Sequence, residues 1–322
     1  MLQFAQTGEK IKATASKLEK VTGLADYLRT LDPASLQLAA TYFTGRPFGL
    51  KDPRTLNLGW RALVQAVEQV SGRSAEEMRV IHSHQPDLGG WAEEALHDRT
   101  HPQPITLVEI DSALERIRLT ETASARIEQL GDLLARLEPV EAGYLVRILS
   151  GEVRIGLQSG LVEEAIAAAF GGAPTDVRRA HMLTGDLGET AVLAAQGKLD
   201  RAAAELGRPV RYMLASPVSG PEEALERMGG GPLWAEEKYD GVRCQFHRTG
   251  SEVLLFSRDL RETTLAFPEV AEAGRRLEHQ VILDGEILGH RAGKVLRFFE
   301  LQRRLGRKVV SAAMRKQVPV VL

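Results

Sequence analysis

The apolar periodicity of this chain changes once, and that change limits the folds open to it. Over the first two hundred residues, apolar side chains recur at spacings of three and four, as in "LGWRALVQAVEQV" and "LVEEAIAAAF", which is the period of an amphipathic helix. Beyond residue 232, "VRCQFHR" and "SEVLLFSR" alternate apolar and polar residues with period two, as strands do. A chain with two such periods predicts a helical domain followed by a domain built on a sheet.

A segment rich in glycine and proline separates the two patterns. We therefore expect an all-α domain over residues 1–204, a linker and entry segment over 205–232, and the first part of an α+β domain with an antiparallel sheet over 233–322. Because the last residues, "VPVVL", have the pattern of an apolar strand, we expect this second domain to be C-terminally incomplete.

Composition excludes several classes of protein. The single cysteine, Cys244, rules out an internal disulfide framework and a cysteine-rich zinc module, and it is typical of a reducing compartment. No apolar run approaches the roughly 18 residues of a membrane span, and the first residues have no signal-peptide core. We expect a cytoplasmic protein that has no membrane partner.

The charge is unevenly distributed, although the net charge is only −2. Residues 1–208 contain 23 basic and 28 acidic side chains, whereas residues 209–322 contain 18 and 15. Within residues 291–316, nine basic side chains accompany one acid, Glu300. Such a patch can bind phosphate, but on charge alone a solvated helix face is the more probable interpretation.

Two pairs of segments in the helical part resemble each other. "LAATYFTGRPF" (38–48) is similar to "LVRILSGEVRI" (145–155), and "PDLGGWAE" (86–93) is similar to "GDLGETAV" (185–192). Two related halves and coincidence in an Ala/Leu-rich chain explain this about equally well.

The segment "EEKYDGVR" (236–243) contains the strongest candidate for covalent chemistry. A lysine acts as a nucleophile only when it is neutral, which requires desolvation or nearby cations. Arg243 could provide that charge and bind a phosphate, and Asp240-Gly241 suits a tight turn that would hold Lys238 at a pocket rim. The alternative is a charged surface turn, and the pattern Lys-x-Asp-Gly alone is a modest signal.

Neighbouring predicted strands carry further polar candidates. In "VILDGEILG", Asp284 and Glu286 lie on one face, because strand side chains alternate with period two. They interrupt an apolar stripe, which indicates a carboxylate for Mg²⁺ or for a ribose hydroxyl, although exposed acids at a rim are also possible. Arg258, at the end of "LLFSR", is placed to meet phosphate or ribose.

The order and spacing of "EEKYDGVR", "FSRD", "ILDGEILG" and "FFELQRRLGRK" resemble the nucleotidyltransferase domain of ATP-dependent DNA ligases of the bacterial type. The helical part is similar to the DNA-binding domain that precedes the catalytic core in one group of these enzymes. "LADYLRTLDPASLQLAATYFTGRPF" and "YLVRILSGEVRIGLQSGLVEEAIAAAF" carry that likeness. The resemblance therefore covers nearly the whole chain.

The resemblance implies an enzyme that uses ATP and Mg²⁺ to seal nicks in double-stranded DNA. It implies that Lys238 attacks the α-phosphate of ATP to give a lysine–AMP adduct, and that AMP then passes to the DNA 5′-phosphate. By the same likeness, Glu236 reads the adenine edge, Arg243 and Arg258 contact the nucleotide, and Glu286 binds ribose or supports the metal. The family is also expected to act as a monomer near the nucleoid, in DNA replication, repair or recombination.

The resemblance also implies contacts with the DNA backbone, since these require only Lys or Arg on one face. We expect them from Arg147 and Arg154 in the helical domain. From the basic segment "KVLRFFELQRRLGRK" (294–308) we expect them from Arg303, Arg304, Arg307 and Lys308. Ordinary surface arginines remain the alternative for each of these residues. Further family motifs and an OB-type domain are not found within residues 1–322.

Three other functions share part of this pattern. An RNA ligase and an RNA-capping guanylyltransferase use the same Lys-x-Asp-Gly chemistry, but the long helical part argues against both. A non-catalytic DNA-binding protein would use only the helical part. In that case, a substitution of Lys238 should leave the function of the protein unchanged.

Overall fold

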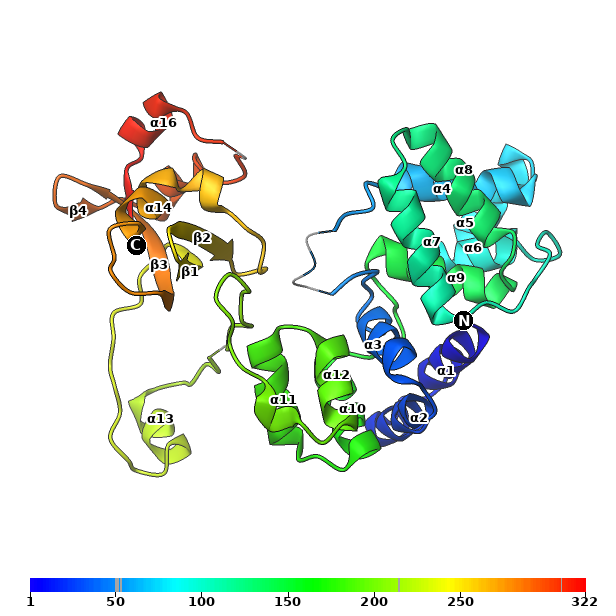
Figure 1. The fold of residues 1–322 in the computed structure, drawn as a ribbon, viewed down its shortest axis with the longest axis horizontal. Coiled ribbons are helices and arrows are strands. Elements are labelled where there is room, and N and C mark those ends of the chain that lie inside the picture. The colour runs from blue at the N-terminus through cyan, green and yellow to red at the C-terminus, as the bar shows by residue number, and fades with distance from the viewer. Residues whose placement is uncertain (50–51, 53, 214, 308) are drawn as a thin grey trace. The chain divides into compact units, whose positions relative to one another are not determined.

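A computed structural model describes residues 1–322 except 50–51, 53, 214 and 308. The chain divides into two compact units, Met1–Ala203 (unit 1) and Ala204–Leu322 (unit 2). Unit 1 is helical and unit 2 contains a small antiparallel sheet (Figure 1). The predicted class, an all-α domain followed by an α+β domain, is confirmed.

Unit 1 consists of helices joined by short connections. Several of them begin at a residue whose side chain accepts a backbone N–H, such as Ser16, Asp32 and Thr106, and several end at a glycine with positive φ, such as Gly72 and Gly171. The described helices are α1 (Leu2–Lys12), α2 (Lys17–Arg29), α3 (Pro33–Tyr42), α4 (Trp60–Ser71), α5 (Ala75–His84), α6 (Leu88–Ala95), α7 (Leu107–Leu119), α8 (Ala123–Leu134), α9 (Pro139–Ser150), α10 (Ser159–Phe170), α11 (Pro174–Thr184), α12 (Leu187–Ala195) and the 3₁₀ turn η1 (Leu199–Arg201).

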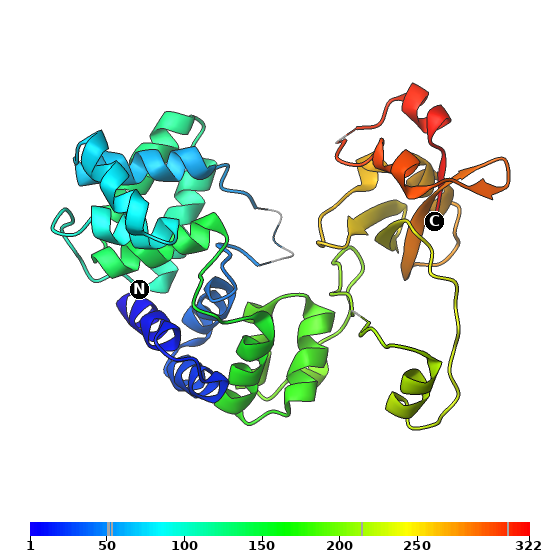
Figure 2. The same ribbon diagram turned by 180° about the vertical axis from the view of Figure 1, so that it is seen from behind.

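The helices of unit 1 pack against each other in pairs whose members come from different parts of the sequence. Helix α3 packs against α12 and α9 packs against α6; likewise α2 packs against α10 and α8 packs against α4. Figure 2 shows the two resulting groups from behind, α4 to α9 in one and α1 to α3 with α10 to α12 in the other. Each group therefore takes one set of helices from either half of the unit, which is the arrangement expected of two related halves.

The resembling segments occupy equivalent places in this packing. A Cβ added to Gly89 in α6 would lie 2.7 Å from the Gly143 carbonyl oxygen of α9, and one added to Gly188 in α12 would lie 2.5 Å from the Gln37 oxygen of α3. Asp87 and Asp186 cap the corresponding helices. The similarity noticed in the sequence thus falls on residues that bring paired helices close together.

Unit 2 is built on a sheet of antiparallel strands in the order β2-β1-β3-β4, with β5 also paired to β3. As the alternation predicted, "VRCQFHR" and "SEVLLFSR" form a hairpin and "QVILDGEILG" forms a strand. The elements are α13 (Pro221–Arg227), β1 (Val242–Thr249), β2 (Glu252–Ser257), η2 (Thr264–Ala266), α14 (Pro268–Gly274), β3 (Val281–Arg291), β4 (Lys294–Val295), α15 (Phe298–Gln302), α16 (Ala312–Gln317) and β5 (Val320–Val321).

The two faces of this sheet have different surroundings. One face carries Cys244 and Phe246, which pack with Val270 of α14 and other apolar residues into the core of unit 2. The opposite face carries Gln245 and His247, which are also buried. Alternation alone suggests that these two polar residues are exposed, so something must cover them.

Residues 207–213, which the sequence places in the linker, provide that cover. The Gly207 N–H donates to Nδ1 of His247 at 3.1 Å. The backbone of Val210 exchanges two hydrogen bonds with the Gln245 amide, at 2.9 and 2.5 Å. The polar face of β1 therefore binds backbone groups of a segment that has no strand partner of its own.

Among the described residues, no helix is both long enough and apolar enough to cross a membrane.

Candidate active site

Lys238 lies in an exposed segment without regular structure that leads directly into β1. Residues 231–240 form neither helix nor strand, and the side chains of Glu236, Lys238 and Asp240 are exposed. The candidate nucleophile thus lies shortly before β1, the strand that carries Arg243.

Gly241 connects this segment to β3. A Cβ at this position would lie 2.4 Å from the Ile287 carbonyl oxygen, so only glycine fits. Its φ is outside the left-handed region, which means that close approach of two backbones, rather than a special turn conformation, requires the glycine. The motif therefore fixes the entry of β1 against the strand that carries Glu286.

Arg243 and Glu286 face each other across β1 and β3 in the register of the sheet. The surroundings of Glu286 act on its pKa in opposite directions. Partial burial raises the pKa, whereas the Gly241 N–H and the charges of Arg243 and Lys238 lower it, and burial dominates. Lys238 therefore lies close enough to Glu286 for its charge to lower the pKa of that carboxyl.

The guanidinium of Arg243 has several partners. Its Nε and Nη2 donate to the two carboxylate oxygens of Asp284 at 3.1 and 2.8 Å, and Nη1 donates to the Met213 carbonyl oxygen at 3.1 Å. The Tyr212 ring lies beneath it, 4.4 Å from Cζ to the ring centroid. Sequence reasoning missed Tyr212, because the segment that contains it has no periodic pattern.

Arg258 lies on the other side of β1. It is exposed in the turn after β2, one residue beyond the ladder pair Cys244–Ser257. The ladder between β1 and β2 ends at that pair, and the chain turns there, because the Ser257 N–H donates to the Arg261 carbonyl oxygen and the Leu260 N–H donates to the Ser257 carbonyl oxygen. Cys244 itself is buried in the core, which raises the pKa of its thiol to about 12, so it is not a competing nucleophile.

The carboxylates of this face set limits on a metal site. No group of three or more His, Cys, Asp and Glu side chains gathers to hold a metal ion anywhere in the described part of the chain. Of the two carboxylates of β3, Asp284 is engaged by Arg243, which leaves Glu286 as the candidate metal ligand. One carboxylate fits Mg²⁺, because that ion commonly keeps its waters and takes most other ligands from substrate phosphates.

Two of the arginines expected at the DNA backbone are buried, and those predictions need correction. The side chain of Arg147 is 2% exposed, with its Nε 3.1 Å from Asp87 Oδ1 and its guanidinium over the Tyr144 ring. The side chain of Arg304 is fully buried, and it pairs with both oxygens of Glu269 at 2.5 Å. A charge that is removed from water needs a partner of opposite charge. Both arginines have such a partner, and through it they hold helices together.

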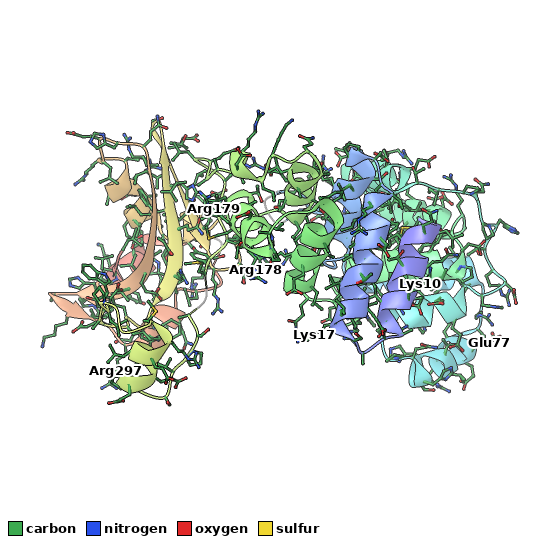
Figure 3. The ribbon with its side chains drawn as sticks, turned by 90° about the horizontal axis from the view of Figure 1, so that it is seen from below. Lys10, Lys17, Glu77, Arg178, Arg179 and Arg297 are labelled. Atoms are coloured by element: carbon green, nitrogen blue, oxygen red, sulfur yellow. The ribbon has the colours of Figure 1, made fainter. Side chains whose placement is uncertain are left out.

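The remaining candidates for backbone contact are accessible. Arg154, Arg303 and Arg307 are exposed, and Arg154 has positive φ in the loop between α9 and α10. Lys308 lies outside the described residues, so its contact stays a prediction. Figure 3 shows further exposed cations of unit 1 that sequence analysis did not name: Lys10 on α1, Lys17 on α2, and Arg178 and Arg179 on α11.

Two family models match the chain. The model of the family described as "DNA ligase N terminus" matches residues 1–167, just over half of the chain, and that of the "ATP dependent DNA ligase domain" matches residues 212–322. The chain belongs to the ATP-dependent DNA ligase family. The second match contains every candidate of unit 2, from Tyr212 through Lys238 to Arg307.

Individual relatives support the same family. A protein named probable DNA ligase from Koribacter versatilis is 42% identical over 321 residues, covering 99% of this chain and 55% of the relative. DNA ligases from Methanothermobacter thermautotrophicus and Archaeoglobus fulgidus are each 33% identical, with 100% and 99% of this chain and 59% of each relative covered. This ligase-family chain spans about half the length of the curated relatives that it matches.

Proposed function

We propose that the protein is an ATP-dependent DNA ligase that seals nicks in duplex DNA. The observation that carries this proposal is the shared setting of Lys238 and Glu286. Gly241 joins the exposed lysine segment to β3, and Arg243 faces Glu286 across the sheet, all within a region that matches an ATP-dependent ligase domain. A nucleophile, a cation and a carboxylate are the groups that nucleotidyl transfer requires.

The proposed reaction begins at the Lys238 amine. In its neutral form Nζ attacks the α-phosphorus of ATP, so that a P–N bond forms and the bond to pyrophosphate breaks. The AMP then moves to the 5′-phosphate of the nick, and Lys238 leaves as the P–N bond breaks. The 3′-hydroxyl finally attacks the adenylated phosphate, forms the phosphodiester bond and releases AMP. Most of the catalysis comes from positioning and from opposite charges placed around the phosphates.

The other residues have supporting roles in this proposal. Glu236 recognises the adenine edge, Arg243 and Arg258 bind phosphate, and Glu286 binds the ribose or helps to hold Mg²⁺. When bound, Mg²⁺ neutralises phosphate charge. Arg154, Arg303 and Arg307 remain proposed contacts to the DNA backbone, and the protein is proposed to act as a monomer in the cytoplasm.

Labelling of the full-length protein tests the proposal. We expect incubation with α-labelled ATP and Mg²⁺ to give a covalent, acid-labile protein–AMP adduct that Lys238→Ala abolishes. Lys294→Ala, which removes an exposed lysine of the same sheet, should label normally. Equal labelling of the Lys238→Ala variant would end the assignment of the nucleophile, and label from GTP would indicate capping chemistry. A nicked-duplex sealing assay, with nicked RNA as the control, then tests the substrate.

A further inference from the structure

The guanidinium of Arg243 is held on three sides by groups from two segments, β3 and residues 207–213. A guanidinium has five N–H donors. Three of them are used, two by Asp284 of β3 and one by the Met213 carbonyl. The remaining two take no partner among the described residues, and the Tyr212 ring covers one face of the group. The guanidinium of Arg243 is therefore held in one orientation, while two of its N–H donors take no partner among the described residues.

The Tyr212 ring is itself fixed by the sheet. Its hydroxyl donates to the Phe256 carbonyl oxygen of β2 at 3.2 Å. Two residues earlier, the backbone of Val210 is bound by Gln245 of β1. The ring consequently spans from β2 to Arg243 on the polar face of β1, and the same contacts bury it by half.

Neither partner would orient Arg243 well by itself. The side chains of Arg243 and Asp284 are 34% and 48% exposed, and an ion pair that accessible to water contributes little. A flat ring beneath the guanidinium adds a cation–π contact and blocks one side from water. Together, the carboxylate fixes the rotation of the group and the ring fixes its plane.

We propose that Tyr212 and Asp284 are positioning residues, which orient the two free N–H groups of Arg243 toward the phosphate oxygens of ATP. Two parallel N–H groups match two oxygens of one phosphate, provided that the plane of the guanidinium is already set. The inference rests on the proposed function, and it gives Asp284 a role different from that of a metal ligand, since both of its oxygens serve Arg243.

Equilibrium binding of ATP to the full-length protein tests this role without requiring catalysis. The parent is Lys238→Ala, which cannot form the covalent adduct, titrated with ATP and Mg²⁺ in a calorimeter. We expect Tyr212→Leu and Asp284→Asn each to raise the Kd by about fivefold, the size expected of one partly exposed cation–π or ionic contact. Tyr212→Phe keeps the ring and should stay within about twofold of the parent. Glu252→Gln, an exposed acid at the far end of the same sheet, is the matched control and should bind as the parent does.

A double-mutant cycle separates positioning from a general structural role. In an Arg243→Ala background, Tyr212→Leu should change the Kd by less than about twofold, because the residue through which it acts is gone. The same fivefold loss in both backgrounds would overturn the proposal, as would a parent that does not bind ATP. If the effects on ATP binding are coupled but the protein that retains Lys238 forms no lysine–AMP adduct in the labelling assay, the positioning role is supported and the proposed ligase activity is refuted.

Discussion

Glu286 lies between Gly241 and Arg243, and its surroundings leave the pKa of its carboxyl above the usual range. A carboxyl whose pKa is higher in the folded chain than in the unfolded chain binds its proton more tightly when folded. It therefore contributes stability below the unfolded pKa, and this contribution is lost as the pH rises through the folded pKa. At neutral pH the ionised carboxylate of Glu286 therefore lowers the stability of the folded chain.

The first prediction concerns Glu286→Gln. At pH 7.5 the variant should have a slightly higher Tm than the parent, because no charge has to be partly buried, and this gain should shrink toward pH 4. The rate of lysine–AMP formation should fall by about 10- to 100-fold, the value of one hydrogen bond to a charged group. Thermal scans across that pH range and the labelling assay measure both effects. A lower Tm at pH 7.5 would contradict the burial argument.

The second prediction contrasts two arginines that look alike in the sequence. Arg147→Ala should destabilise unit 1 by about 3–5 kcal/mol, since it leaves the buried carboxylate of Asp87 without its cation. Arg154→Ala should change the free energy of unfolding by less than about 0.5 kcal/mol, because the side chain is exposed. Urea unfolding of both variants measures the difference. Equal stability of the two variants would show that the Arg147 network is not structural.

Local patterns decided how far the sequence could predict these residues. Period-two alternation predicted that Asp284 and Glu286 share one face of a strand, whereas the grouping of Lys238 and Arg243 with Glu286 came from the family resemblance. The burial of Arg147 depends on α1, α6 and α9, which come from separate parts of the chain, and no local signal distinguishes it from Arg154. Tyr212 was missed for the same reason: its partners lie 31 and 44 residues away, and its own segment has no period.

At the level of elements, glycine determines how closely the paired helices of unit 1 approach. Gly89 of α6 lies against α9 and Gly188 of α12 lies against α3, whereas a Cβ on Gly23, in the middle of α2, would meet nothing within 4 Å. The three positions are all helical, so intrinsic helix propensity favours alanine at each. Only packing distinguishes them.

The third prediction follows from that contrast. Gly89→Ala and Gly188→Ala should each destabilise the protein by about 1–3 kcal/mol, because the added methyl group overlaps a backbone oxygen that cannot easily move. Gly23→Ala should stabilise it by up to about 1 kcal/mol. Chemical denaturation followed by circular dichroism gives all three values. A destabilising Gly23→Ala together with a neutral Gly89→Ala would reverse the order and reject the account of helix pairing.

At the scale of the whole molecule, the proposed substrate raises a question of charge, because DNA is a polyanion and the chain has a net charge of −2. Residues 1–208 carry more acids than bases, so the proposed contact requires a few exposed cations rather than uniform attraction. Each phosphate neutralised by such a cation adds about 0.9 to the slope of log affinity against log salt. The slope therefore gives the number of phosphate contacts, which the net charge of the chain does not reveal.

The fourth prediction compares the full-length protein with a fragment of residues 1–203, which contains the whole apolar core of unit 1 and is expected to fold alone. The fragment should bind nicked duplex DNA with a shallow salt slope, corresponding to about two to four phosphates. The slope of the full-length protein should be steeper by about 2, and the double variant Arg303→Ala/Arg307→Ala should remove that increment.

The control variant is Arg79→Ala, which removes an exposed arginine paired with Glu76 and should leave the slope unchanged. Affinities measured by fluorescence anisotropy at several salt concentrations give the slopes. Equal slopes for the fragment and the full-length protein would show that unit 2 does not contribute these backbone contacts.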